Sequence, residues 1–179
     1  NTDSASDVLV YNETDDTFNV SVNKEKSRKY IVISSGSTLT TEYRILNSDN
    51  PDGEFEVFQP RVRGLEYSIS HYEDSFYILT NKDKATNFKL MKTPENKTGK
   101  KNWVDVIPHR EDVLLEDIEI FKNYLVVEER SNGLNHIRIM PWNDEPDYYL
   151  PFGSETYSAF TTTNIDFDTD ILRYSYQSL

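Results

Sequence analysis

Short clusters of apolar residues recur along this chain at a nearly constant spacing. Four of them combine aromatic and branched side chains, and their first residues lie 46, 48 and 47 positions apart. These clusters begin at Tyr30, Phe76, Tyr124 and Ile171. Both odd and even positions in them are apolar, which is typical of a strand buried on both faces of a sheet. The pattern therefore predicts a repeating unit of about 47 residues that is built from strands.

Three further strand-like stretches accompany these clusters. A stretch that alternates apolar and polar residues precedes the cluster, and turn residues join the two, which predicts a hairpin. These first strands are Phe18–Val22, Tyr67–Ile69 and Ile118–Ile120. Third strands, with an apolar–basic–apolar pattern, are predicted at Tyr43–Ile45, Phe88–Leu90 and Ile137–Ile139. Fourth strands, each followed by a proline that suits the exit from a sheet, are predicted at Phe55–Phe58, Trp103–Val106 and Asp147–Leu150.

Four strands repeated at this period indicate the blades of a β-propeller. A single four-stranded sheet cannot bury both of its apolar faces, whereas sheets stacked face to face can. We therefore predict an all-β fold and one domain over residues 1–179, a partial propeller of about three complete antiparallel blades with partial blades at both ends. The expected blades span 16–59, 64–107 and 115–152, followed by two inner strands in 157–179 and preceded by an outer strand at 8–11. A β-sandwich is the competing fold, but the same order of strand types in three units favours the propeller.

Composition narrows the partners of such a domain. The chain carries 31 acidic and 19 basic residues, a net charge of -12, which disfavours nucleic acid and anionic membranes and attracts cationic molecules. It has no cysteine, which excludes disulfides, thiolate metal sites and thiol nucleophiles. No apolar run approaches the roughly 20 residues that span a bilayer, and the polar start lacks the features of a signal peptide. We expect a cytoplasmic protein, with the periplasm as the open alternative.

The sequence shows no residue pattern typical of a catalytic centre or of a metal site. No two of the six glycines have the spacing of a Gly-x-Ser-x-Gly elbow, and the three histidines fall in three different units. The run Asp166–Asp170 resembles the start of a calcium loop, but Ile171 stands where that loop needs glycine. We therefore expect no catalytic residue, no metal and no cofactor, and we interpret the aspartate run as a tight turn.

Charged residues concentrate in the third unit. The candidates for a channel wall or a domain interface are Arg110, Glu111, Glu116, Glu119, Glu128, Glu129 and Arg130. Glu119 alternates with Ile118 and Ile120, so it is the residue expected to face a central channel. Two interpretations stay open: a solvated network with weak surface ion pairs, or a wall that attracts basic peptides.

Several stretches together resemble the oligopeptidase B group of the prolyl oligopeptidase family of serine peptidases, in order from about Val8 to Tyr176. They are Asp15–Phe18, Phe58–Arg61, Glu66–Ser68, His71–Tyr72, Phe76–Tyr77, Ile107–Pro108, Arg110–Glu111, Leu125–Arg130 and Gly133–Leu134. The resemblance implies an N-terminal propeller of seven blades that covers a C-terminal α/β-hydrolase domain with a Ser-Asp-His triad. It implies no catalytic residue in this chain, and the loops at 82–86 and 96–101 depart from the family pattern.

The resemblance also defines the expected function. Such a propeller admits short peptides and excludes folded proteins, and the parent enzyme cleaves after Arg or Lys. We therefore expect the hydrolase domain of the same chain and short basic peptides as partners. The alternative is a stand-alone propeller that scaffolds other proteins. In either case the flanks of the end blades are apolar, so the chain alone is expected to self-associate through them.

Overall fold

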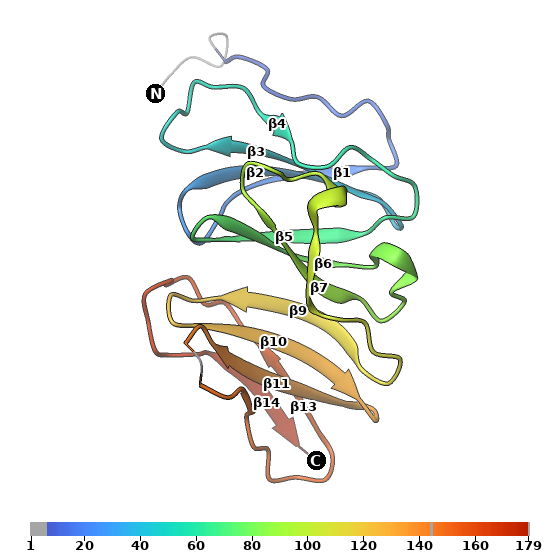
Figure 1. Ribbon diagram of the computed structural model, residues 1–179, viewed down its shortest axis with the longest axis vertical. Helices are drawn as coiled ribbons and strands as arrows, with labels where there is room; N and C mark the ends of the chain where they lie inside the picture. The colour runs from blue at the N-terminus through green and yellow to red at the C-terminus, as the bar shows by residue number, and fades with distance from the viewer. Residues whose placement is uncertain (1–6, 144, 179) are drawn as a thin grey trace.

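The strands of this protein form a series of antiparallel sheets. A computed structural model describes residues 7–143 and 145–178 (Figure 1). The first sheet contains β1 (Asn19–Lys24), β2 (Tyr30–Gly36), β3 (Thr41–Asn47) and β4 (Glu56–Val57). The second contains β5 (Tyr67–Tyr72), β6 (Ser75–Thr80), β7 (Lys89–Pro94) and β8 (Val104–Ile107). The third contains β9 (Leu114–Ile120), β10 (Tyr124–Ser131), β11 (Leu134–Pro141) and β12 (Tyr148–Tyr149), and the fourth pairs β13 (Tyr157–Thr161) with β14 (Tyr174–Ser178).

Each four-stranded sheet keeps its strands in chain order. The predicted all-β fold with blades of four antiparallel strands is therefore confirmed. The strands fall within the predicted blade ranges except that β9 begins at Leu114, one residue earlier than expected. Two short 3-10 turns, η2 (Lys82–Lys84) and η3 (Lys100–Asn102), lie in the loops of the second sheet. In the described part of the chain, no helix has the length and apolar character needed to cross a membrane.

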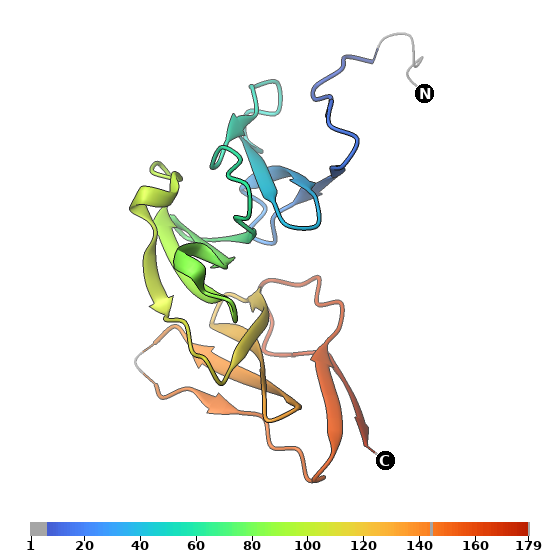
Figure 2. The same ribbon diagram turned by 90° about the vertical axis from the view of Figure 1, so that its right-hand side faces the viewer.

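Successive sheets pack against each other through their faces. Figure 2 shows the last strands β8 and β12 on the left of the view and the first strands β9 and β13 toward the right. A backbone hydrogen bond joins the start of the third strand of one sheet to the start of the next sheet at two equivalent places. The nitrogen of Thr41 donates to the carbonyl of Leu65 at 3.1 Å, and that of Leu115 donates to the carbonyl of Asn87 at 3.0 Å. The first strands thus face the inner side, where a propeller has its channel.

The core lies between sheets because the second strand of each sheet is buried on both faces. Phe76 and Ile78 of β6 pack toward the first sheet, while Tyr77 and Leu79 pack toward the third. Phe76 is fully buried, and its ring centre lies 5.0 Å from that of Phe58 in the first sheet. This double burial explains why odd and even positions are both apolar in the repeated clusters.

The outer strand expected at 8–11 stays a prediction, because its partner strands would belong to a preceding blade. Residues 8–11 form no strand, and the side chains of Val8, Leu9 and Val10 are more than half exposed. An outer strand exists only when an inner strand pairs with it, and the described residues offer none to this segment. The neighbouring residues are held instead by side chains, since Glu13 forms an ion pair with Arg61 that lowers the pKa of the glutamate.

The aspartate run is not a tight turn. It lies in a long loop, residues 162–173, that joins β13 to β14, so the last strand begins at Tyr174 rather than at Ile171. The loop packs on the third sheet: Lys122 pairs with Asp168 at 2.7 Å, and the Lys122 nitrogen donates to the Phe167 carbonyl. The Asn164 side chain holds the two ends of the loop together. It donates a hydrogen bond to the Thr162 carbonyl and accepts one from the Arg173 backbone nitrogen. These contacts favour the open loop over the local turn.

Both end sheets expose apolar side chains. Val22 of β1 is 64% exposed and Phe160 of β13 is 49% exposed. A hollow of about 430 Å³ lies beside β1, between Val8–Tyr11 and Phe55. We predict that the chain alone forms dimers or larger species at about 0.1 mM in light scattering, because contiguous apolar faces drive association. A strictly monomeric chain at that concentration would contradict this expectation.

Candidate functional site

Glu129 is the most buried of the charged residues singled out in the third unit. Only 2% of its side chain is exposed. Its Oε1 lies 2.5 Å from Arg110 Nη2 and 3.3 Å from Arg138 Nη1, and the Tyr149 hydroxyl donates to its Oε2 at 2.7 Å. Arg110 belongs to the segment between β8 and β9, so the carboxylate ties this connection to the third sheet. Glu129 is therefore a satisfied buried ion rather than an open binding group.

The other charged candidates divide between separate places. Arg130 pairs with Glu116 at 2.7 Å on an exposed part of the sheet, an arrangement worth about 0–1 kcal/mol. Glu128 accepts from the Thr161 nitrogen at 2.8 Å and so joins β10 to β13. Glu111 takes part through its backbone, where its carbonyl accepts from the Asn87 side chain. The structure brings Arg110 to Glu129 and Glu116 to Arg130, but it does not gather all seven residues.

Glu119 of β9 is the residue that the sequence pattern predicts to face a central channel. It borders an open cavity of about 550 Å³ that is lined by Asp117 and Ile118 of β9 and by Thr161–Asn164. Lys26, in the β1–β2 turn of the first sheet, pairs with Glu119 at 2.9 Å. The Lys26 ammonium also lies 3.4 Å from the ring centre of Phe121, a cation–π contact. One turn of the first sheet thus reaches across to the third.

The same turn also bonds to the second sheet. Glu25 Oε2 accepts from the His71 backbone nitrogen at 3.1 Å, and the Ser27 hydroxyl lies 2.9 Å from His71 Nδ1. His71 Nε2 lies 3.1 Å from a carboxylate oxygen of Glu95. The ring is buried, which lowers the His71 pKa, so it is neutral at pH 7.

Burial also shifts the carboxyl groups around this inner site. It raises the pKa of Glu25 to about 7 and raises the pKa of Asp117 above its usual value. Burial lowers the pKa of Lys26, although the hydrogen bond and the charge of Glu119 act to raise it. Glu25 and Lys26 were not among the site residues expected from the sequence, because they are far from β9 along the chain and no local pattern marks their approach. The site is therefore an acidic inner surface, formed by Asp117 and Glu119, on which Lys26 pairs with Glu119.

Glu25 gives a pH dependence with a defined sign. Its pKa in the folded chain, about 7, is above the ordinary 4.5, so folding favours the protonated form. The stabilisation is complete below about pH 4.5 and is lost as the pH rises through 7. We expect Glu25→Gln to raise the urea midpoint at pH 8 and to leave it unchanged at pH 4. The exposed Glu54→Gln serves as the control, and an equal shift at both pH values would contradict the prediction.

Comparison with known proteins identifies the family of this fold. All of the chain, residues 1–179, matches the family described as "Prolyl oligopeptidase, N-terminal beta-propeller domain". The chain belongs to this family. The expected membership in the prolyl oligopeptidase family is therefore confirmed.

Two relatives match almost the whole length of the chain. It is 39% identical over 178 residues to "Dipeptidyl aminopeptidase BI" of Pseudoxanthomonas mexicana, covering 99% of this chain and 24% of that protein. It is 30% identical over 177 residues to "Protease 2" of Moraxella lacunata, covering 99% of this chain and 25% of that protein. The chain thus spans about a quarter of the length of these relatives.

Solved structures of oligopeptidase B have the same fold. The enzyme from Trypanosoma brucei with covalently bound antipain, in a closed form, superposes with a TM-score of 0.90 at 26% identity, over 99% of this chain and 26% of that one. Oligopeptidase B from Leishmania major superposes with a TM-score of 0.88 at 25% identity, over 98% of this chain and 26% of that one. The partial propeller is therefore a portion of the prolyl oligopeptidase N-terminal domain.

Proposed function

We propose that this chain is the part of a serine oligopeptidase propeller that filters peptides on their way to the catalytic centre. The proposal is supported by one observation above all, the match of the full chain to the N-terminal propeller domain of the prolyl oligopeptidase family. In this proposal the triad belongs to an α/β-hydrolase domain of the same parent chain, which packs against the propeller. The proposed location of the parent enzyme is the cytoplasm.

The proposed substrates are short peptides that are cleaved after Arg or Lys. The inner surface supports this choice because Asp117 and Glu119 line its cavity and the chain as a whole carries a net charge of -12. A negative surface in a confined space raises the local concentration of cationic molecules. Lys26 neutralises part of Glu119, so Asp117 is the freer carboxylate when it is ionised.

The test uses the full-length natural protein and two peptide substrates, one with Arg at the cleavage site and flanking Lys, the other neutral. We expect activity on the basic peptide, and we expect Asp117→Asn with Glu119→Gln to lower its kcat/KM about two- to tenfold at low ionic strength. The loss should shrink in high salt because exposed charges are then screened. Glu54→Gln, an exposed charge outside the cavity, is the matched control.

The result separates the parts of the proposal. An enzyme that cleaves basic peptides equally well with and without the two substitutions would overturn the role of the acidic cavity. An enzyme that does not cleave after Arg or Lys would overturn the substrate class. A natural protein whose measured mass shows no hydrolase domain would favour the stand-alone scaffold instead.

A further inference from the structure

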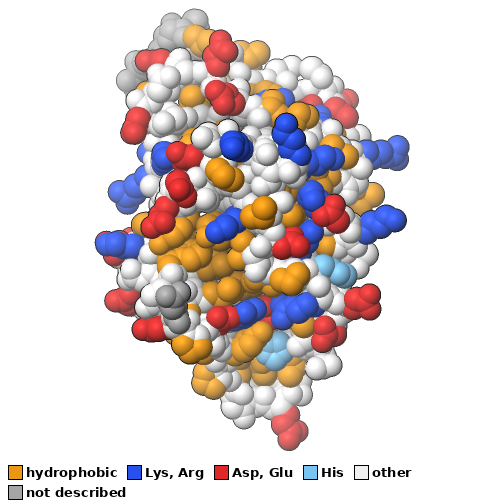
Figure 3. Space-filling view, in the orientation of Figure 1, with side chains coloured by type: hydrophobic (Ala, Val, Ile, Leu, Met, Phe, Trp, Pro, Cys, Tyr) orange, Lys and Arg blue, Asp and Glu red, His pale blue; other side chains and the backbone are white. Residues whose placement is uncertain are grey.

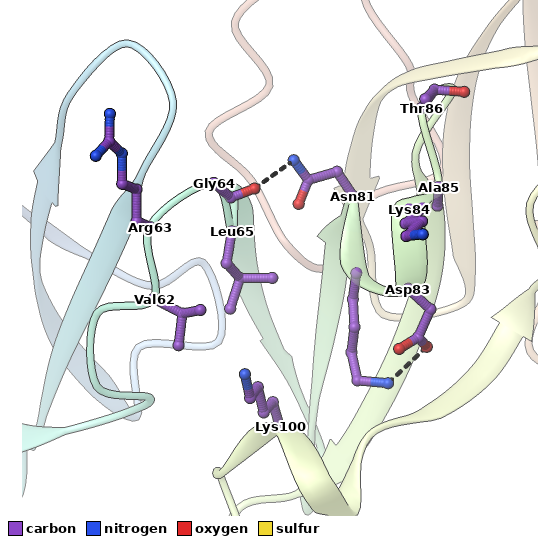
Figure 4. A pocket seen from close by; sticks show the side chains of 11 residues that line it. Val62, Arg63, Gly64, Leu65, Asn81, Asp83, Lys84, Ala85, Thr86 and Lys100 are labelled. Atoms are coloured by element: carbon purple, nitrogen blue, oxygen red, sulfur yellow. Dashed lines mark hydrogen bonds and ion pairs between the residues drawn. The ribbon is translucent and has the colours of Figure 1, made fainter.

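A second cavity lies away from the inner surface, at the boundary between the first two sheets. It measures about 380 Å³, within the range of small-molecule sites. Its walls come from residues 62–65 between β4 and β5, from residues 81–86 around η2, and from Lys100 of η3 (Figure 4). Three separate loops therefore build one hollow on the outer part of the fold.

The charge of this cavity is opposite to that of the chain. Four basic residues border it against one carboxylate, that of Asp83. They are Arg63, Lys82, Lys84 and Lys100. Figure 3 shows Lys and Arg side chains along the right-hand edge of the molecule, the side on which the η2 turn lies in Figure 1. A basic cavity in a chain with a net charge of -12 is not explained by average composition.

The one carboxylate does not neutralise the cluster. Asp83 already pairs with Lys82 at 2.7 Å and with Lys89 at 3.1 Å. In residues 7–143 and 145–178, no carboxylate lies within ion-pair distance of Lys84, Lys100 or Arg63. An anion in the cavity would be attracted to these basic side chains.

The cavity combines a cationic edge with an apolar base. In Figure 4 the Lys100 ammonium points up toward the space beside Val62 and Leu65, and the Arg63 guanidinium extends away from it at the rim. Leu65 and Ala85 are buried below this space. The Asn81 side chain donates to the Gly64 carbonyl at 3.0 Å and holds two of the loops together. A ligand there meets positive charge on one side and carbon on the other.

The backbone of the η2 turn adds an independent observation. Asp83 and Lys84 have φ values of 61° and 62°, the left-handed region that favours glycine. Two consecutive non-glycine residues in this conformation are strained, and such strain is concentrated at binding and catalytic sites. A glycine at position 84 would suit the backbone better, so the backbone does not account for the lysine.

We propose that this cavity binds a small phosphate-bearing molecule that extends between Lys100 on one side and Lys84 on the other, with an apolar or flat portion over Leu65 and Ala85. Ammonium groups bind phosphate as point charges, without the geometric demand of arginine, which suits side chains contributed by separate loops. The site is independent of the acidic inner cavity, and no step of peptide cleavage is assigned to it.

The experiment is calorimetric titration of the full-length protein with inorganic phosphate, pyrophosphate and adenosine monophosphate in turn. We expect binding that weakens as the ionic strength rises from about 0.05 to about 0.5 M. Tighter binding of the adenosine compound than of inorganic phosphate would show that the apolar base contributes. Tightest binding of pyrophosphate would show that charge alone selects the ligand.

Matched variants locate the site. Lys84→Gln combined with Lys100→Gln is expected to weaken phosphate binding about tenfold or more, while the exposed Lys92→Gln on β7 leaves it unchanged. Lys84→Gly is expected to weaken binding and to raise the melting temperature, because glycine relieves the left-handed backbone. Absence of binding by all three probes, or an equal loss in Lys92→Gln, would overturn the proposal.

Discussion

Replacing Glu129 with alanine is expected to lower the free energy of unfolding by about 3 kcal/mol. The side chain is almost fully buried, and its carboxylate is shared by Arg110, Arg138 and Tyr149. Its removal takes the carboxylate from Arg110, while Arg138 keeps its pair with Asp147, so the partly buried Arg110 charge loses its counter-ion. The measurement is the urea midpoint and slope of the chain, followed by circular dichroism.

Two variants sharpen this test. Glu129→Gln keeps hydrogen-bonding capacity and loses only the charge, so an intermediate loss is expected. Glu116→Ala removes an exposed partner of Arg130, and its expected effect is about 0–1 kcal/mol. If Glu129→Ala and Glu116→Ala were equally mild, Glu129 would not be the ion that ties the β8–β9 connection to the third sheet.

Replacing Phe76 with alanine is expected to cost about 3–5 kcal/mol, because a fully buried ring leaves a cavity. The ring centre lies 5.0 Å from both Phe58 and Tyr30, which belong to the neighbouring sheet. The loss should therefore weaken the contact between sheets as well as the second sheet itself. Trp103, in the same cluster, reports the local packing through its fluorescence in a background where Trp142 is replaced by phenylalanine.

The Phe76 variant also tests whether the sheets unfold together. If stacking between sheets dominates, Trp103 fluorescence and circular dichroism should show one shared transition at a lower urea concentration. Val104→Ala, a matched change at a side chain that is 54% exposed, should move the transition little. Separate transitions for the two signals would show that the second sheet unfolds independently of its neighbours.

The candidate site was less predictable than the strands, and β10 shows why. Glu128 and Glu129 are adjacent, and sequence pattern treats them as one acidic pair. Alternation along β10 sends Glu129 to the face of Leu125 and Val127, where Arg110 meets it, and Glu128 to the opposite face, where Thr161 meets it. The alternation gives the two faces, but the groups that meet each carboxylate come from other segments, so the local pattern does not name them.

The inner surface shows the same limit at longer range. Lys26 meets Glu119 although 93 residues separate them, and the contact exists because stacking sheets brings the β1–β2 turn beside β9. Tertiary contacts also decide the conformation of the loop at 162–173. Its ion pair with Lys122 and the hydrogen bond between Asn164 and Arg173 favour an open loop over a local turn. Local propensity describes only the isolated segment, and tertiary contacts outweighed it here.

The amino-acid sequence by itself determined the grouping of strands by fours and the identity of the buried faces. It could do so because a strand that is covered on both faces must be apolar at odd and even positions. Each repeat contains one cluster with this pattern. Only the tertiary structure decided which charges meet, which cavity is acidic and which is basic, and where the last hairpin begins. Those features depend on distances between loops of different sheets, and such distances follow from stacking rather than from any single segment.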